Sequence, residues 1–334
     1  MTTATAPAKL ILCGEHAVVY GRPAIAVPLG DLRARAEVAP GAPGAGLRLL
    51  APDLGEVWAT AAPDNPLAEL ALVSAERLGL AGADLTVTLG SAIPIASGMG
   101  SGAAIGTALV RALAAHAGAE LPPAEVAALV YASERRFHGT PSGIDNTVVA
   151  YERAVWYVRA QDQGPETKDQ GHEREAPAEA TIAAGRPTIE PLAVGASLSL
   201  VVGDTGVRSA TRLPVSAVRE AWQANPVEYE ALFDAVGDLA TRARFALAAG
   251  EAAVLGHLLD ANQALLERMG VSSPELGRLV TAAREAGALG AKLSGAGWGG
   301  VMLALVTDET RVAVEEALRE AGAARVLATT VSSR

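Results

Sequence analysis

A glycine-rich stretch followed by an alanine-rich segment constrains the fold of this chain more than any other feature. Residues 91–102 are rich in small residues, with glycine at 98, 100 and 102, and the alanine-rich segment runs from Ala103 to about Ala117. Glycine reaches backbone conformations closed to other residues and lets the main chain approach a ligand closely. The alanine-rich segment predicts a helix that is apolar around most of its circumference and therefore buried. Free N–H groups at the start of that helix would make the stretch a cradle for phosphate.

A second interpretation of the same stretch is a flexible linker in which Ser101 caps the helix. The chain contains no G-x-x-x-x-G-K-[ST] sequence, so the loop is not a Walker A motif. The loop alone therefore leaves both interpretations open.

Strand and helix patterns alternate in both halves of the chain. Short apolar runs that stop at turn residues predict strands, and apolar residues at helical spacing predict helices. We expect strands at 10–13, 24–29, 85–89, 197–202, 301–306 and 324–331, and helices at 103–117, 123–137, 229–249, 251–269 and 309–321. This mixture predicts the α+β class. A polar segment at 161–187 indicates an exposed insertion, and we place a lobe boundary near its end, between residues 1–190 and 191–334.

Charge and cysteine content exclude several kinds of partner. The chain has 334 residues and a formal net charge of −10, so its surface repels nucleic acid and anionic lipid. The single cysteine, Cys13, allows no disulfide within the chain, which suits a reducing compartment. No signal-peptide pattern and no membrane-spanning apolar run of about 18 residues are predicted. We expect a cytoplasmic protein that acts on a small molecule.

Lysine is rare in this chain. Among 27 basic residues only Lys9, Lys168 and Lys292 are lysines, and two of them lie close to glycine-rich motifs. A bias in coding explains the excess of arginine. A retained lysine can also mark a tight site that needs a compact ammonium, because the broad arginine fork does not fit there.

Two carboxylates are candidates for chemistry. Asp145 follows the turn-forming residues 139–143, where a carboxylate can accept a proton from a hydroxyl, although Asp in a turn commonly bonds to its own backbone instead. Glu134 falls on the apolar side of the predicted helix 123–137. A carboxylate there needs a cation, either a metal ion or a neighbouring arginine such as Arg135 or Arg136.

A second glycine motif, at 295–300, matches the G-x-G-x-x-G pattern of dinucleotide-binding folds. That fingerprint follows a strand and opens a helix. Here the motif precedes an apolar run at 301–306 that indicates a strand, so we expect a glycine-rich turn packed against another loop or a ligand.

The stretch from Lys9 to Gly21 resembles the first motif of the mevalonate kinase family. This family is part of the superfamily of galactokinases, homoserine kinases, mevalonate kinases and phosphomevalonate kinases. Residues 94–104, 138–146 and 292–300 resemble the other superfamily motifs in order and spacing, so the resemblance covers nearly the whole chain. It implies a two-lobed α+β kinase with ATP, Mg²⁺ and substrate in the cleft between the lobes, and a homodimer.

The resemblance also implies roles for individual residues. Asp145 matches the catalytic base, and Lys9 matches the lysine that helps activate the substrate hydroxyl. Glu134 matches a magnesium ligand, and Ser101 is a further metal candidate. The expected substrate-binding residues are Glu15, His16 and Thr211, and the expected ATP-binding residues are Pro94, Ser97, Gly98, Met99, Gly100, Ser101, Gly102 and Ala103.

The sequence departs from the family pattern at two positions. Gly102 stands where the family has a second serine that ligates magnesium, and glycine offers no ligand, so Ser101 or water would fill that place. Trp298 replaces a usual glycine and would narrow the ATP side of the cleft. The expected reaction is phosphorylation of the primary hydroxyl of mevalonate. The alternatives are a related kinase for phosphomevalonate, homoserine or a sugar, and a non-catalytic ATP-binding regulator.

Overall fold

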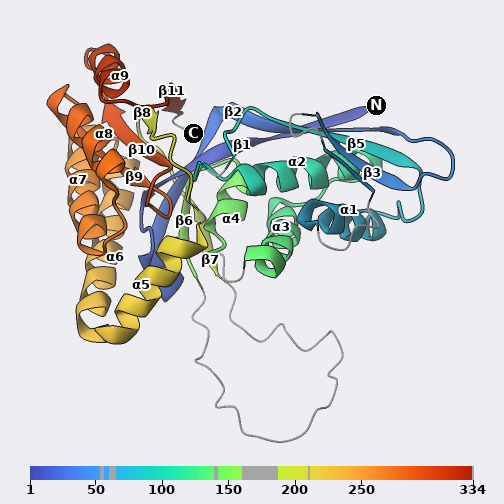
Figure 1. The fold of residues 1–334 in the computed structure, drawn as a ribbon, viewed down its shortest axis with the longest axis horizontal. Coiled ribbons are helices and arrows are strands. Elements are labelled where there is room, and N and C mark those ends of the chain that lie inside the picture. Colours follow the sequence, from blue (N-terminus) through green and yellow to red (C-terminus); the bar gives the residue numbers. More distant parts are fainter. Residues whose placement is uncertain are drawn as a thin grey trace, which may run out of the picture.

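The structure is a computed structural model, and it describes residues 1–52, 56–59, 65–95, 97–138, 142–159, 187–209 and 211–332, with the side chains of 56–59 and 136–138 left out. Two β-sheets and a set of helices make up these parts (Figure 1). The elements are β1 (Thr2–Cys13), the 3-10 helix η1 (Ala17–Tyr20), β2 (Ala24–Pro40), β3 (Leu47–Ala51), β4 (Glu56–Ala59), α1 (Pro66–Arg77), β5 (Leu85–Ser91), α2 (Ser101–His116), α3 (Pro123–His138), α4 (Ile144–Tyr151), β6 (Val155–Val158), β7 (Thr188–Pro191), β8 (Leu198–Asp204), α5 (Arg212–Ala224), α6 (Pro226–Ala249), α7 (Ala252–Arg268), α8 (Pro274–Glu285), β9 (Gly290–Ser294), β10 (Val301–Val306), α9 (Arg311–Glu320) and β11 (Arg325–Val331).

The first sheet is built around the long strand β2. Its order is β4-β3-β5-β2-β6-β7, and β1 also pairs with β2. All described pairings in it are antiparallel except β3 with β5. Helices α1, α2 and α3 lie along one face of this sheet (Figure 1). Helix α2 is buried over most of its length, because small alanine and glycine side chains allow it to pack closely between the sheet and α3.

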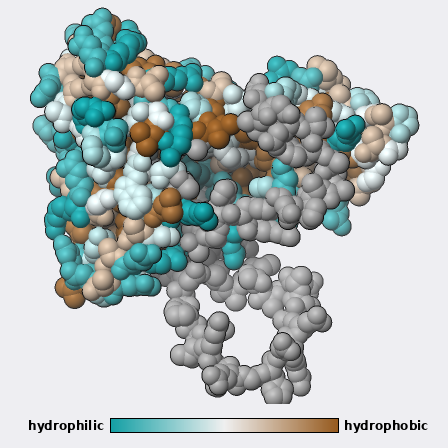
Figure 2. Space-filling model, in the orientation of Figure 1, coloured by the Kyte–Doolittle hydropathy of each residue, from teal (hydrophilic) through white to brown (hydrophobic). Residues whose placement is uncertain are grey.

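The second sheet has the antiparallel order β11-β8-β10-β9. Its central strand β10 is buried along its whole length, as its uninterrupted apolar sequence requires. Helices α6, α7, α8 and α9 gather on this side of the molecule (Figure 1). On the face shown in Figure 2, hydrophobic and hydrophilic residues are interspersed over these helices.

The two sheets share one hydrophobic core. A single cluster of buried side chains includes Leu10 of β1, Val87 of β5, Leu258 of α7 and Leu303 of β10. The strands of the first sheet all lie within residues 2–191 and those of the second within residues 198–331. The lobe boundary at 190 stays a prediction, and the shared core means that the two parts are packed against each other.

The predicted elements that the structure describes are confirmed, with changes at their ends. Strand β10 has the predicted bounds, α2 begins two residues before the predicted start, and β2 extends far beyond the predicted 24–29. The sequence patterns do not predict helices α1, α4, α5 and α8. The polar segment 161–187 lies outside the described residues except for Pro187. Among the described helices, none combines the length and the apolar character needed to cross a membrane.

Candidate active site

The glycine-rich loop is held against strand β1. The backbone N–H of Lys9 donates a hydrogen bond to the carbonyl of Met99 at 3.0 Å. Gly98 and Gly100 have positive φ angles of 83° and 74°, which favour glycine. A Cβ on Gly100 would lie 2.9 Å from Cγ of Lys9. Because Gly100 has no side chain, the Lys9 side chain can extend alongside it.

Helix α2 begins directly after this loop, at Ser101. Its N-cap residue is Gly100, which has no side chain to accept a hydrogen bond from the first turn. The first N–H groups of the helix therefore remain available for an anion, as the phosphate-cradle interpretation requires.

Lys9 and Asp145 form an ion pair beside the loop. Lys9 Nζ lies 2.8 Å from Asp145 Oδ1, and the lysine side chain is 2% exposed whereas the aspartate side chain is 34% exposed. Asp145 is the second residue of α4, which begins after Gly143 with φ 87°. The Asp145 carboxylate therefore faces a buried ammonium and is partly exposed.

Glu134 lies near this pair on α3 and is half-buried. Burial, together with the negative charge of Asp145, raises the pKa of Glu134 to about 8, and the positive charge of Lys9 opposes this rise. Within the described parts of the chain, no hydrogen bond or ion pair involves this side chain. A carboxylate in such surroundings attracts a cation, and a metal ion at Glu134 stays a prediction.

A pocket lies between the two parts of the molecule. It is lined by Ser97 and Gly98 of the loop, by Thr211, and by Ser294, Gly297 and Gly300, among others. The turn at 295–300 thus packs against the glycine-rich loop, as the sequence predicts, and a Cβ on Gly300 would lie 2.9 Å from the carbonyl oxygen of Ser97. Thr211 is exposed at the start of α5.

Glu15 and His16 do not line this pocket themselves, but they contact the segment that does. Glu15 is 1% exposed and forms an ion pair with Lys292, while its second carboxylate oxygen accepts a hydrogen bond from Asn262 Nδ2 at 3.1 Å. His16 Nε2 lies 2.9 Å from the carbonyl oxygen of Ala296 and donates to it. Burial lowers the pKa of His16 to about 4, so the ring is neutral near pH 7. Substrate binding by these two residues stays a prediction.

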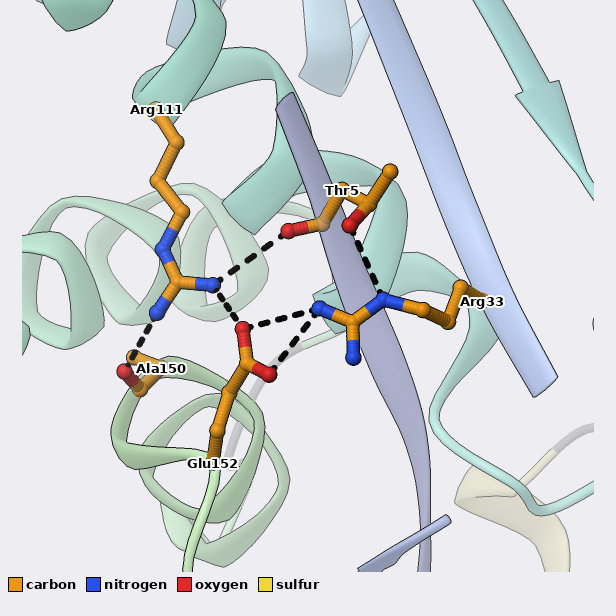
Figure 3. A network of polar contacts seen from close by, with 5 residues as sticks. All are labelled: Thr5, Arg33, Arg111, Ala150 and Glu152. Atoms are coloured by element: carbon orange, nitrogen blue, oxygen red, sulfur yellow. Dashed lines mark hydrogen bonds and ion pairs between the residues drawn. The ribbon is translucent and has the colours of Figure 1, made fainter. Parts of the chain in front are cut away.

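A polar network fixes the far ends of the helices that carry the site (Figure 3). Glu152, at the C-terminal end of α4, accepts hydrogen bonds from Arg33 of β2, at 2.9 and 3.0 Å, and from Arg111 of α2. Arg111 also donates to the carbonyl of Ala150 at 2.7 Å, and Arg33 donates to Thr5 of β1 at 2.9 Å. The network ties α2, α4 and β1 together. Helix α2 follows the glycine-rich loop, α4 contains Asp145, and β1 contains Lys9.

Sequence reasoning missed Glu152, Arg111 and Asn262. None of them lies in a motif, and their roles depend on contacts between distant segments. Lys292 stands out in the sequence, because it is one of only three lysines in the chain.

The cluster can therefore bind an anion at the start of α2, hold a cation at Glu134, and accept a proton at Asp145. These are the three operations of phosphoryl transfer to a hydroxyl, which depends mainly on positioning and on neutralising charge.

Comparison with known proteins agrees with this chemistry. Residues 65–153 match the GHMP kinases N terminal domain, and residues 243–324 match GHMP kinases C terminal. Mevalonate kinases of Thermococcus sibiricus and Pyrococcus horikoshii are each 33% identical to this chain over 96% of its length, covering 93% and 92% of those proteins. The crystal structure of L. major mevalonate kinase in complex with R-mevalonate is 30% identical, with a TM-score of 0.80 over 100% of this chain and 96% of that chain. The chain therefore belongs to the mevalonate kinase family of the GHMP kinases.

Proposed function

We propose that this chain transfers the terminal phosphoryl group of ATP to the primary hydroxyl of mevalonate, giving 5-phosphomevalonate and ADP. The names of its relatives support mevalonate as the substrate, since all of those reported above are mevalonate kinases. The structural observation that carries the proposal is the contact of 2.8 Å between Lys9 and Asp145 beside the glycine-rich loop.

In this proposal Asp145 accepts the proton of the substrate hydroxyl as the oxygen attacks phosphorus. A base in that role must reach the proton it removes, and Asp145 is the partly exposed member of the pair. The buried Lys9 ammonium offsets the negative charge that develops on the attacking oxygen. Its fixed position, packed against Gly100, means that no reorganisation is needed at the moment of reaction.

The phosphates of ATP would lie along the loop from Pro94 to Ala103. Their negative charge is matched by the free N–H groups at the start of α2. Thr211, which lines the same pocket as Ser97 and Gly98, would contact the transferred phosphoryl group.

Mg²⁺ would be held by Glu134 and Ser101 together with the phosphates. The raised pKa of Glu134 and its lack of a partner among the described side chains fit a cation ligand. No group of three or more His, Cys, Asp or Glu in the described residues gathers into a metal site of its own. This agrees with magnesium, which commonly binds one or two carboxylates and completes its shell with phosphates and water. When bound, the ion neutralises phosphate charge.

The test is an ADP-release assay with ATP, magnesium and a panel of alcohols: mevalonate, phosphomevalonate, homoserine and galactose. The proposal predicts turnover with mevalonate and background rates with the others. Preference for another alcohol would contradict the assignment of mevalonate as the substrate. ATP binding without turnover of any alcohol would favour the non-catalytic regulator.

We propose further that the protein works as a homodimer in the cytoplasm. The family resemblance supports the dimer, and the single buried cysteine suits a reducing compartment. Sedimentation velocity at micromolar concentration tests the dimer, and a monomer would contradict it.

A further inference from the structure

A buried ion pair remains without a role in this mechanism. Lys292 of β9 is fully buried, and its ammonium contacts Glu15 and, at 2.5 Å, the carbonyl of Leu293. Glu15 also accepts the hydrogen bond from Asn262 of α7. Both charges are thus removed from water and satisfied by each other and by neutral groups. Moving both charges out of water is costly, so the net contribution of such a pair to stability is small. Stability alone therefore does not explain why this pair is present.

Two further contacts join the same two segments. Ser294 Oγ accepts from the N–H of Ile11 at 2.9 Å and donates to the carbonyl of Ile11 at 3.2 Å. His16 donates to the carbonyl of Ala296. Residues 11–16 and residues 292–296 are therefore tied by contacts at three places, and we call this set of contacts the interlobe joint.

The interlobe joint lies between the two halves of the candidate site. On one side, residues 11–16 continue strand β1, which carries Lys9 and, through it, the contact with Asp145. On the other side, residues 292–296 lead into the turn at 295–300, which lines the pocket next to the phosphate loop. A change in the joint moves one half of the site relative to the other. A displacement of about 1 Å between reacting groups can lower a rate on the order of 100-fold.

We propose that Lys292 is a positioning residue that acts through Glu15 to set the turn at 295–300 against the Lys9–Asp145 pair. This inference rests on the proposed function, because it assigns the pair a role in the same site. It also explains why lysine is retained here in a chain whose basic residues are almost all arginine. A side chain with no exposed surface and a backbone carbonyl as second partner leaves no room for the wider guanidinium group.

Two variants separate a positioning role from a structural one. Lys292→Met leaves Glu15 buried without its cation, whereas the combination of Lys292→Met with Glu15→Gln removes both charges. Leu318→Ala is the matched control, because Leu318 is a fully buried residue of α9 that lies outside the joint and the pocket, and its truncation lowers stability alone. If Lys292→Met does not fold, Asn262→Ala weakens the joint while both charges remain.

The measurements are the melting temperature, kcat, and KM for ATP and for mevalonate. We expect the double variant to melt well above Lys292→Met, because no unpaired charge remains buried. Its kcat is expected to stay about 10-fold or more below that of the parent, with smaller changes in either KM. Asn262→Ala is expected to lower kcat by a smaller factor. Recovery of kcat together with the melting temperature, or an equal loss of kcat in Leu318→Ala, would overturn the proposal.

Amide hydrogen exchange tests the joint without turnover. The N–H groups of Trp298 and Gly300 donate to the carbonyls of Val271 and Val207, at 2.8 and 2.9 Å, so this turn is protected in the parent. We expect faster exchange over 295–300 in the double variant than in Leu318→Ala. If exchange over 295–300 is the same in both variants, Lys292 and Glu15 do not position this turn. Failure of the parent to phosphorylate mevalonate contradicts the proposed substrate instead, and the exchange result still decides the role of Lys292.

Discussion

Two glycines that lie two residues apart in the phosphate loop should respond in opposite ways to the same substitution. Gly100 has a φ of 74°, and a Cβ there would meet Cγ and Cε of Lys9 at 2.9 and 3.2 Å. Gly102 lies in the first turn of α2, is exposed, and has no atom within 4 Å of an added Cβ. Gly100→Ala is therefore strained, whereas Gly102→Ala is accommodated.

The magnitudes follow from the backbone. A left-handed conformation costs a residue other than glycine about 1–2 kcal/mol, so Gly100→Ala should lower the free energy of unfolding by at least about 1 kcal/mol. Replacing glycine by alanine in a helix stabilises a protein by about 0.5–1 kcal/mol. The two variants should thus differ by roughly 2 kcal/mol in stability.

Urea unfolding followed by circular dichroism measures this difference in the absence of ligands. Gly100→Ala should also lower kcat, on the order of 10-fold or more, because the added methyl group displaces the lysine that contacts Asp145. Equal stability of the two variants, or a Gly100→Ala protein with parental kcat, would show that Gly100 is not needed to make room for Lys9.

Four other substitutions test the remaining parts of the site. Asp145→Asn should lower kcat by about 10²–10⁴-fold in the ADP-release assay, as expected for loss of a general base, while ATP still raises the melting temperature. Burial lowers the pKa of His16 to about 4, so stability should fall as the pH drops from about 6.5 to about 4, and His16→Asn should flatten this dependence in thermal melts. The pKa of Glu134 is raised to about 8, so the protein without metal should lose stability as the pH rises from about 4.5 to about 8, and Glu134→Gln should remove that loss in melts with EDTA. Arg111→Gln should cost about 1–3 kcal/mol in urea unfolding, because the carbonyl of Ala150 and one side of Glu152 lose a charged donor. A pH profile of His16→Asn or of Glu134→Gln that has the same shape as that of the parent, or parental stability of Arg111→Gln, would contradict the corresponding assignments.

The elements with strong local patterns could be predicted from the sequence. Helix α2 is marked by its alanine content, and β10 by an apolar run that follows a glycine turn. Helix α4 was missed because its eight residues are too few to show a helical period and follow a turn motif. The length of β2 was missed because its second half alternates charged and small residues, and pairing with β1 and β5 decides its extent.

The candidate site could be predicted in part, for a similar reason. Lys9, Asp145 and the loop lie in motifs, and the structure brings them together. The partners of Glu15 come from residues about 250 to 280 positions away, and no local pattern encodes such a contact. The sequence does not distinguish a buried carboxylate from one that contacts a substrate. Only the fold, which places Lys292 beside Glu15, shows that Glu15 is buried in an ion pair.

In the proposed reaction, the Lys9–Asp145 pair promotes transfer of the terminal phosphoryl group from ATP to mevalonate. The most direct test is to incubate the protein with ATP, magnesium and mevalonate and to follow the products by ³¹P NMR, in parallel for the parent and for Asp145→Asn. We predict one phosphate monoester on the primary hydroxyl for each ADP released by the parent, and only a slow trace with the variant. A parent that releases ADP without forming this ester, or a variant that forms it at the parental rate, would contradict the account.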